Sequence, residues 1–315
     1  MKILVTGGLG FIGINLCKLL INNEDKPIVL DHFGCCESKN YEVAKKLGIR
    51  IIGHNINNPF KIRGNIDQIY HLASRASPIN YQKFPVETAL TGAIGTKNML
   101  DLAKEKNARI LFSSSSEVYG DPLQSPQNEH YWGNVNPIGA RSCYDESKRF
   151  GEALVMAYNR EYKVDTKIVR IFNSYGPGLR IDDGRIIPNF INQALSNKKI
   201  TIYGNGTQTR SFCYVQDTVA GIHAMMNSES FTGPVNIGSD EEHTIIEVAK
   251  IIKELLKLNV ELIFEKLPSD DPHKRKPDIS LAKKMLNWQP TVSLRDGLEM
   301  TIRYFKNIRK FKQKL

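Results

Sequence analysis

The sequence has little cysteine, and its cysteines are poorly placed for cross-links or metal binding. There are 5 in 315 residues, an odd number scattered along the chain. The adjacent pair at positions 35 and 36 lacks the spacing of a metal site, and no matching cysteine or histidine pair follows it. We therefore expect free thiols and no bound metal. The five residues are Cys17, Cys35, Cys36, Cys143 and Cys213.

Long apolar runs are also missing. No stretch approaches the roughly 18 consecutive apolar residues that a membrane-spanning helix needs. The amino terminus runs from Met1 directly into an apolar strand pattern, without the architecture of a signal peptide. Hydrophobic residues make up 41% of the chain and charged residues 24%, which is ordinary for a globular protein. We expect a cytoplasmic protein with one large domain or two smaller ones.

Acidic residues are too few to balance the basic ones, and the net charge is +10. Part of the excess lies at the carboxyl end, where such a run is usually a solvated helix face and tail. A basic pocket for a small molecule with a diphosphate would account for some of the rest. We therefore expect neither nucleic acid nor a membrane as a partner. The terminal cluster comprises Arg303, Lys306, Arg309, Lys310, Lys312 and Lys314.

A glycine-rich turn follows the first predicted strand. Residues 2–6 are apolar, glycines follow at 7, 10 and 13, and an amphipathic helix pattern continues to about residue 22. Glycine lets the backbone turn tightly and approach a pyrophosphate, while the helix amino terminus offers amide groups and partial positive charge. The next strand, 28–30, ends at Asp31, whose carboxylate suits the ribose hydroxyls of NAD and repels the 2′-phosphate of NADP. This pattern predicts NAD as the cofactor.

A second cluster points to chemistry at the carboxyl end of a later strand. The apolar run 109–112 leads into hydroxyl-bearing residues 113–116, at the strand end where open α/β sheets bind ligands. Tyr144 and Lys148 are spaced to share one face of a helix. An ammonium group favours the phenolate, so the tyrosine could act as a base. The alternative is a solvated lysine beside a half-buried tyrosine.

Strands and helices alternate through the first half of the chain. Further strands are predicted at 49–52, 68–73 and 166–171, and helices at 86–106 and 143–161. This order predicts an α/β fold, a Rossmann-type doubly wound parallel sheet. From residue 174 onward turns are frequent, with helices predicted at 217–227, 244–258 and 294–308. We expect an NAD-binding domain over 1–173, completed by returning strands and helices, and a smaller α/β substrate lobe over 174–315.

Together these motifs resemble the extended short-chain dehydrogenase/reductase family, and within it the UDP-glucuronate decarboxylase group. The resemblance covers nearly the whole chain. It implies bound NAD, a UDP-sugar in the carboxyl-terminal lobe, and a homodimer formed by helices near 86–106 and 144–160. Its most specific segments are 114–122, 131–139, 143–146 and 270–279.

The resemblance also implies roles for individual residues. Tyr144 would take the proton of the sugar 4-hydroxyl, Lys148 would lower the pKa of Tyr144, Ser115 would orient the 4-oxygen, and Glu117 would be a second acid/base or a positioning group. The implied cofactor-binding residues are Gly7, Gly10, Phe11, Ile12, Gly13, Asp31, Asn55, Ile56, Leu72, Ala73, Ser74, Tyr144 and Lys148. The implied substrate-binding residues are Ser116, Asn173, Arg185, Tyr203, Arg210 and Arg275.

Several activities fit these roles. The favoured one oxidises C4 of UDP-glucuronate and decarboxylates the resulting β-keto acid to give UDP-xylose. The alternatives are a C4-dehydrogenase, epimerase or 4,6-dehydratase acting on another nucleotide sugar, such as a GDP-linked heptose, and a non-catalytic NAD-sensing regulator. Ser116 replaces the Asp that dehydratases of the family usually carry, which disfavours dehydration. Arg75, where the family has Pro, could bind a sugar carboxylate or indicate a different sugar.

Overall fold

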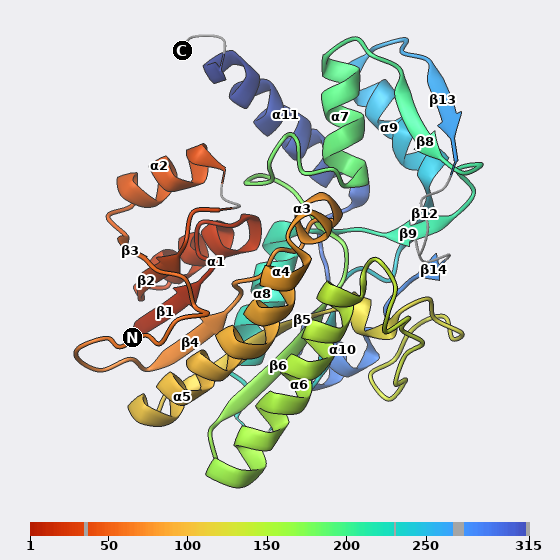
Figure 1. Ribbon diagram of the computed structural model, residues 1–315. Coiled ribbons are helices and arrows are strands. Elements are labelled where there is room, and N and C mark those ends of the chain that lie inside the picture. Colours follow the sequence, from red (N-terminus) through yellow and green to blue (C-terminus); the bar gives the residue numbers. More distant parts are fainter. Residues whose placement is uncertain (35–36, 230, 267–273, 313–315) are drawn as a thin grey trace.

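A seven-stranded parallel sheet forms the centre of the molecule (Figure 1). The computed structural model describes residues 1–34, 37–229, 231–266 and 274–312. The strand order is β11-β6-β5-β4-β1-β2-β3, which confirms the predicted doubly wound α/β fold. The strands are β1 (Lys2–Thr6), β2 (Lys26–Asp31), β3 (Arg50–Gly53), β4 (Gln68–His71), β5 (Arg109–Ser115), β6 (Thr166–Ile171) and β11 (Val235–Ile237).

Both faces of this sheet are buried, because most of its strands are continuous buried runs whose successive side chains point to opposite faces. Ile3 and Val5 of β1 pack in one core with helices α1 (Phe11–Asn22) and α8 (Val215–Met226). Leu4, between them, packs on the opposite face with α5 (Thr96–Lys106) and α6 (Ser142–Tyr162). The two helical layers leave the carboxyl ends of the strands open toward the second half of the chain.

The helix predicted over 86–106 is interrupted. It comprises α4 (Pro85–Leu90), a π-helical turn, η1 (Thr91–Gly95), and α5. A Cβ atom on Gly92 would lie only 2.4 Å from the Cβ of Ser147 on α6, so glycine permits the close approach of the two helices here. π-helical turns such as η1 occur mostly as single turns inserted into α-helices.

The sheet also receives a strand that we did not predict individually. β11 comes from the second half of the chain and pairs with β6 at the edge. It has only three residues, too few for a recognisable alternation of side chains. The short helix α10 (Ser280–Leu286) contacts β11, so the second half contributes to the sheet domain as well as to the lobe.

Elements from the second half of the chain form a lobe above the carboxyl edge of the sheet (Figure 1). Its apolar core joins three helices, of which α9 begins with a capping box between Thr244 and Glu247. Paired short strands complete it. The lobe elements are α7 (Ile186–Leu195), α9 (Ile245–Leu256), α11 (Leu294–Lys312), β8 (Ile200–Tyr203), β9 (Thr209–Ser211), β12 (Glu242–Thr244), β13 (Leu262–Glu265) and β14 (Lys274–Arg275).

Cys17, Cys143 and Cys213 carry free thiols, while Cys35, Cys36 and residues 270–273 lie outside the described residues. Within the described ranges, no three His, Cys, Asp or Glu side chains are grouped so that they could hold a metal ion. None of the helices in those ranges is both long and apolar enough to cross a membrane.

Candidate active site

A cavity of about 600 Å³ lies between the carboxyl edge of the sheet and the lobe. This volume suits a small-molecule site. Every residue that the sequence suggested for catalysis, cofactor binding or substrate binding lines this one cavity. They come from segments far apart in the chain, from Gly7 in the first turn to Arg275 in β14.

The glycine-rich turn forms a close-packed cradle at one end of the cavity. Gly7 has a φ of +68°, and a Cβ there would lie 2.9 Å from the backbone of Ala73. A Cβ on Gly13 would lie 2.3 Å from the carbonyl oxygen of Gly7. Side chains are therefore excluded where the turn meets the amino terminus of α1, and the free amides of that helix can face a pyrophosphate.

Asp31 at the end of β2 is held beside this turn. Its Oδ2 accepts a hydrogen bond from the amide of Leu9 at 3.1 Å, and its Oδ1 accepts one from the amide of Phe33 at 3.0 Å. The carboxylate is thus oriented from both sides while it lines the cavity. Together with the glycine cradle, this arrangement fits the adenosine half of NAD.

Replacing Asp31 with Asn should test this placement. The amide keeps one acceptor oxygen but loses the charge, so we expect NAD affinity to fall about tenfold, since charge-assisted hydrogen bonds are roughly twice as strong as neutral ones. NADP should bind better than it does to wild type, because the repulsion of its 2′-phosphate is relieved. Fluorescence titration with NADH and NADPH measures both. An unchanged preference would contradict the assignment.

Tyr144 and Ser115 meet at the base of the cavity. Tyr144 lies in the first turn of α6, and its side chain hydrogen-bonds to that of Ser115 at the end of β5. Burial raises the pKa of Tyr144 to about 12, while the hydrogen bond to Ser115 acts in the opposite direction. The net shift is opposite to the one expected from a neighbouring lysine alone, so burial is the stronger influence on this phenol.

Lys148 lies one helical turn beyond Tyr144, as the spacing predicted. Its Nζ donates to the carbonyl oxygen of Ser113 at 2.7 Å and lies 5.7 Å from the centre of the Tyr144 ring. Burial lowers the pKa of Lys148 to about 7, with Glu152 opposing this shift. The ammonium and the phenol therefore face the same cavity wall, but the lysine is anchored by the strand end rather than by the phenol.

Glu117 follows Ser115 and lies between two guanidinium groups. It pairs with Arg141, and Nη2 of Arg275 lies 3.4 Å from its Oε2. Burial alone would raise its pKa, but the charges of Arg275 and Arg141 outweigh burial and lower it. Glu117 is therefore ionised near neutral pH, which favours a positioning role over that of a proton donor.

Arg141 and Tyr81 were missed by the sequence reasoning. Tyr81 lies on α3 (Pro78–Lys83), and its ring stacks on that of Tyr144 with centroids 5.2 Å apart and planes 10° apart. It is 1% exposed, and its hydroxyl has no hydrogen-bond partner among the described residues. A buried hydroxyl at a cavity wall is well suited to a ligand. The position of Arg141, one turn before Tyr144, was a usable signal, whereas Tyr81 had none.

The lobe contributes neighbouring arginines. Arg210 of β9 stands opposite Arg275 of β14 in parallel register, and both are buried. Asn173 and Tyr203 line the same part of the cavity. Two adjacent cationic side chains in a cavity wall favour an anionic ligand.

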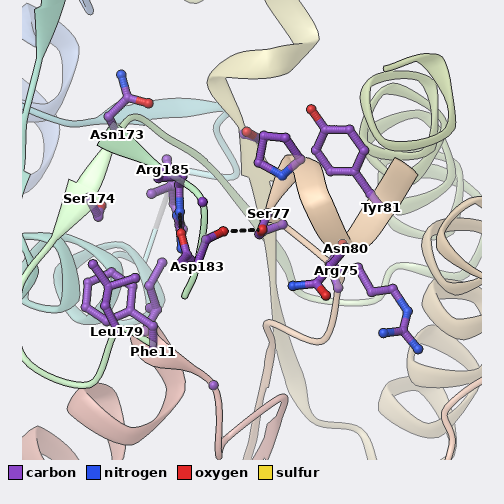
Figure 2. Close-up of a pocket in the computed structure, with 18 of the residues that line it drawn as sticks. Phe11, Arg75, Ser77, Asn80, Tyr81, Asn173, Ser174, Leu179, Asp183 and Arg185 are labelled. Atoms are coloured by element: carbon purple, nitrogen blue, oxygen red, sulfur yellow. Dashed lines mark hydrogen bonds and ion pairs between the residues drawn. The ribbon is translucent and has the colours of Figure 1, made fainter. Parts of the chain in front are cut away.

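The segment that carries Arg185 touches the sheet domain across the cavity (Figure 2). Arg185 forms a two-pronged ion pair with Asp183, and the hydroxyl of Ser77 donates to the carbonyl oxygen of Asp183 at 2.7 Å. Figure 2 shows Tyr81 on the side of the pocket opposite Asn173 and Arg185. Asn173 and Arg185 thus lie across the pocket from the tyrosine that stacks on Tyr144.

Arg75 is engaged differently from the sequence-based suggestion. Its Nη2 donates to Glu87 at 2.9 Å, and its guanidinium lies 4.4 Å from the centre of the Phe84 ring. His32, next to Asp31, is 3.5 Å away. Glu87 offsets the charge of Arg75 on the Asp31 side of the cavity, so this position does not argue for a sugar carboxylate at Arg75.

The sheet, the glycine cradle with Asp31, and the Ser115–Tyr144–Lys148 group together define an NAD-dependent protein of the short-chain dehydrogenase/reductase type. The chain belongs to the NAD dependent epimerase/dehydratase family, whose model matches residues 3–238. This membership confirms the family resemblance and the predicted cofactor, NAD.

Individual proteins of this family are also similar to the chain over nearly its whole length. UDP-glucuronic acid decarboxylase 6 of Arabidopsis thaliana is 51% identical over 304 residues, covering 95% of this chain and 87% of the relative. UDP-glucuronic acid decarboxylase 1 of Xenopus tropicalis is 47% identical over 307 residues, covering 97% of this chain and 72% of the relative. The structure of UDP-glucuronic acid 4-epimerase from Bacillus cereus with UDP-glucuronic acid and NAD is 30% identical, with a TM-score of 0.88 over 98% of this chain and 100% of that one.

Proposed function

We propose that the protein is a UDP-glucuronate decarboxylase that oxidises the sugar at C4 and releases UDP-xylose. The observation that carries this proposal is the placement of the hydrogen-bonded Ser115–Tyr144 pair in a cavity walled by buried arginines, Arg210 and Arg275 among them. Such a cavity suits a substrate that carries both a diphosphate and a carboxylate. The decarboxylase relatives, at 47–51% identity, support the same substrate.

The residues of the chain have distinct tasks in this reaction. Ser115 is oriented by the amide of Glu117, which donates to its Oγ at 3.3 Å, and its hydroxyl can hold the sugar 4-oxygen. Tyr144 accepts the proton from that oxygen. For this step the phenol must be ionised, so the positive charge that bound NAD would bring to the site would have to offset the burial that raises the pKa of Tyr144. When bound, NAD supplies the hydride acceptor at C4 and later the hydride donor. The 4-keto acid then loses carbon dioxide because the electrons of the broken C–C bond pass into an enolate, which is reprotonated at C5.

The ionised state of Glu117 disfavours dehydration. A leaving hydroxyl must be protonated, and Glu117 between Arg141 and Arg275 holds no proton near neutral pH. Ser116 offers no acid at the adjacent position. Epimerisation of UDP-glucuronate at C4 is the second candidate, because the Bacillus cereus enzyme carries that name and shares the fold.

A product assay separates these candidates. Purified protein is incubated with UDP-glucuronate, and carbon dioxide, UDP-xylose and UDP-galacturonate are quantified by mass spectrometry and NMR. We expect stoichiometric carbon dioxide and UDP-xylose. UDP-galacturonate without carbon dioxide would establish the epimerase, and turnover only of a GDP- or dTDP-linked sugar would contradict the proposed substrate.

We also propose a homodimer built on α4, η1 and α6. Val86, Leu90 and Ile94 recur at helical spacing on α4 and η1 and are 71%, 41% and 43% exposed. Phe150 on the neighbouring α6 is 50% exposed. Such a row of exposed apolar side chains on packed helices is typical of a helical interface.

Introducing a charge into this row should break the dimer. We expect Leu90→Asp to shift the protein from dimer to monomer at micromolar concentration, because a buried unpaired carboxylate is costly. Light scattering after size exclusion measures the mass. Leu47→Asp is the matched control, since Leu47 is 40% exposed at the end of α2 (Ser38–Lys46) and should leave the mass unchanged. A monomeric wild type would contradict the proposal.

The proposed function also assigns the cofactor and the substrate to different parts of the chain. We propose that residues 1–173, with the returning elements β11, α8 and α10, form the NAD-binding domain, and that the rest of 174–315 forms the lobe that binds the nucleotide sugar. The buried free thiols of Cys17 and Cys213 are in keeping with a reducing, cytoplasmic setting.

A further inference from the structure

Arg275 reaches the cavity from a very short strand. β14 contains only Lys274 and Arg275, and it pairs with β9 through these two residues. The Arg275 side chain is 2% exposed and donates to the carbonyl oxygens of Ser116 and Gly120 in addition to its contact with Glu117. Two residues of pairing are little support for a buried guanidinium, so its position depends on the residues that follow.

Gln127 holds those residues. Its backbone amide donates to the carbonyl oxygen of Lys276 at 2.8 Å. Its side-chain Oε1 accepts from the backbone amide of Lys276 at 2.9 Å. Its carbonyl oxygen accepts from the amide of Asp278 at 2.8 Å. Gln127 is fully buried, and its Nε2 donates to the carbonyl oxygen of Gln124 at 2.6 Å. Its backbone and side chain thus form a clamp on residues 276–278.

The clamp is attached to the central sheet. Asn236 of β11 donates from Nδ2 to the carbonyl oxygens of both Gln127 and Asp278, each at 3.0 Å. Its Oδ1 accepts from the hydroxyl of Tyr119 at 2.9 Å. Residues 127 and 278, although distant in sequence, are therefore fixed to one strand, and a rigid element supports the position of Arg275.

We infer that Gln127 is a positioning residue, whose clamp on residues 276–278 holds the Arg275 guanidinium against Glu117. The inference rests on the proposed function, in which these two charges lie beside the reacting sugar. Gln127 is not among the described residues that line the cavity, so it acts through Arg275 and not on the substrate. Nothing in its local sequence marks it for this role.

Gln127→Met tests the inference, because it keeps the side-chain length and removes both side-chain hydrogen bonds. We expect kcat/KM for UDP-glucuronate to fall about 10- to 100-fold, the scale of a displacement near 1 Å. The acid limb of the kcat/KM profile should move to higher pH, because Arg275 helps to keep the pKa of Glu117 low. Gln68→Met, a buried glutamine at the opposite end of the sheet bonded to Asn227, is the control for lost stability.

The outcomes are distinguishable. A Gln127→Met protein with the kcat/KM and acid limb of wild type, or a crystal structure of it with Arg275 still on Glu117, would overturn the positioning role. Wild type without turnover would instead contradict the proposed function. If Gln127→Met does not fold, Lys276→Pro removes the backbone amide that donates to Gln127 Oε1, and the same shift of the acid limb is expected. Because Lys276→Pro also removes the side chain that pairs with Glu242, Lys276→Ala is its control and should keep the wild-type limb. A wild-type limb in Lys276→Pro overturns the inference equally.

Discussion

Tyr144→Phe is expected to lower kcat for UDP-glucuronate about 10²- to 10⁴-fold, the usual contribution of a positioned general base. The substitution removes only the hydroxyl that hydrogen-bonds to Ser115, while the ring stack on Tyr81 remains. The phenol is buried beside Ser115, and phenylalanine offers no group that could accept the proton in its place. Steady-state rates of carbon dioxide release give the ratio directly.

Tyr158→Phe provides the matched control on the same helix. Tyr158 is buried and its hydroxyl donates to Asp101 at 2.6 Å, so the control loses a comparable hydrogen bond away from the cavity. It should retain the kcat of wild type at a similar cost in melting temperature. If Tyr144→Phe released carbon dioxide at the wild-type rate, the assignment of Tyr144 as the base would be wrong.

Local patterns were enough to predict the cofactor end of the site. The strand, glycine turn and helix of residues 2–22 are consecutive, and Asp31 follows at the end of the next strand. The physical requirements of this unit, tight turning and an exposed helix terminus, act on neighbouring residues, so they leave a readable spacing. The same holds for Tyr144 and Lys148 on one helical face.

Features of the site that depend on contacts between distant segments could not be predicted from the sequence. Tyr81 is important only because α3 packs beside α6, and Gln127 only because residues 276–278 return to it. The sign of the Tyr144 pKa shift was also inaccessible, since spacing reports the neighbouring lysine but not the extent of burial. These properties depend on tertiary packing. The residue types involved are common throughout the chain, so they give no local signal in the sequence.

Glu117→Gln is expected to affect both stability and turnover. The substitution keeps the size of the side chain but leaves Arg141 and Arg275 without the carboxylate that they share. Breaking a buried ion pair in this way costs about 3–5 kcal/mol. We therefore expect the free energy of unfolding in urea to fall by about that amount, and kcat/KM to fall at least about 10²-fold as the arginines shift.

The pH dependence of this loss of stability tests whether the charge of Glu117 causes it. The folded-state pKa of Glu117 is lowered, so its stabilisation is present above the ordinary glutamate pKa of about 4.3 and is lost as the pH falls through the lowered value. The stability gap between wild type and Glu117→Gln should accordingly be full at pH 7 and should narrow below about pH 4.3. Glu254→Gln, which breaks the exposed pair with Arg295, should change stability by less than about 1 kcal/mol at any pH. A Glu117→Gln protein as stable as that control would show that the two guanidinium groups do not depend on this carboxylate.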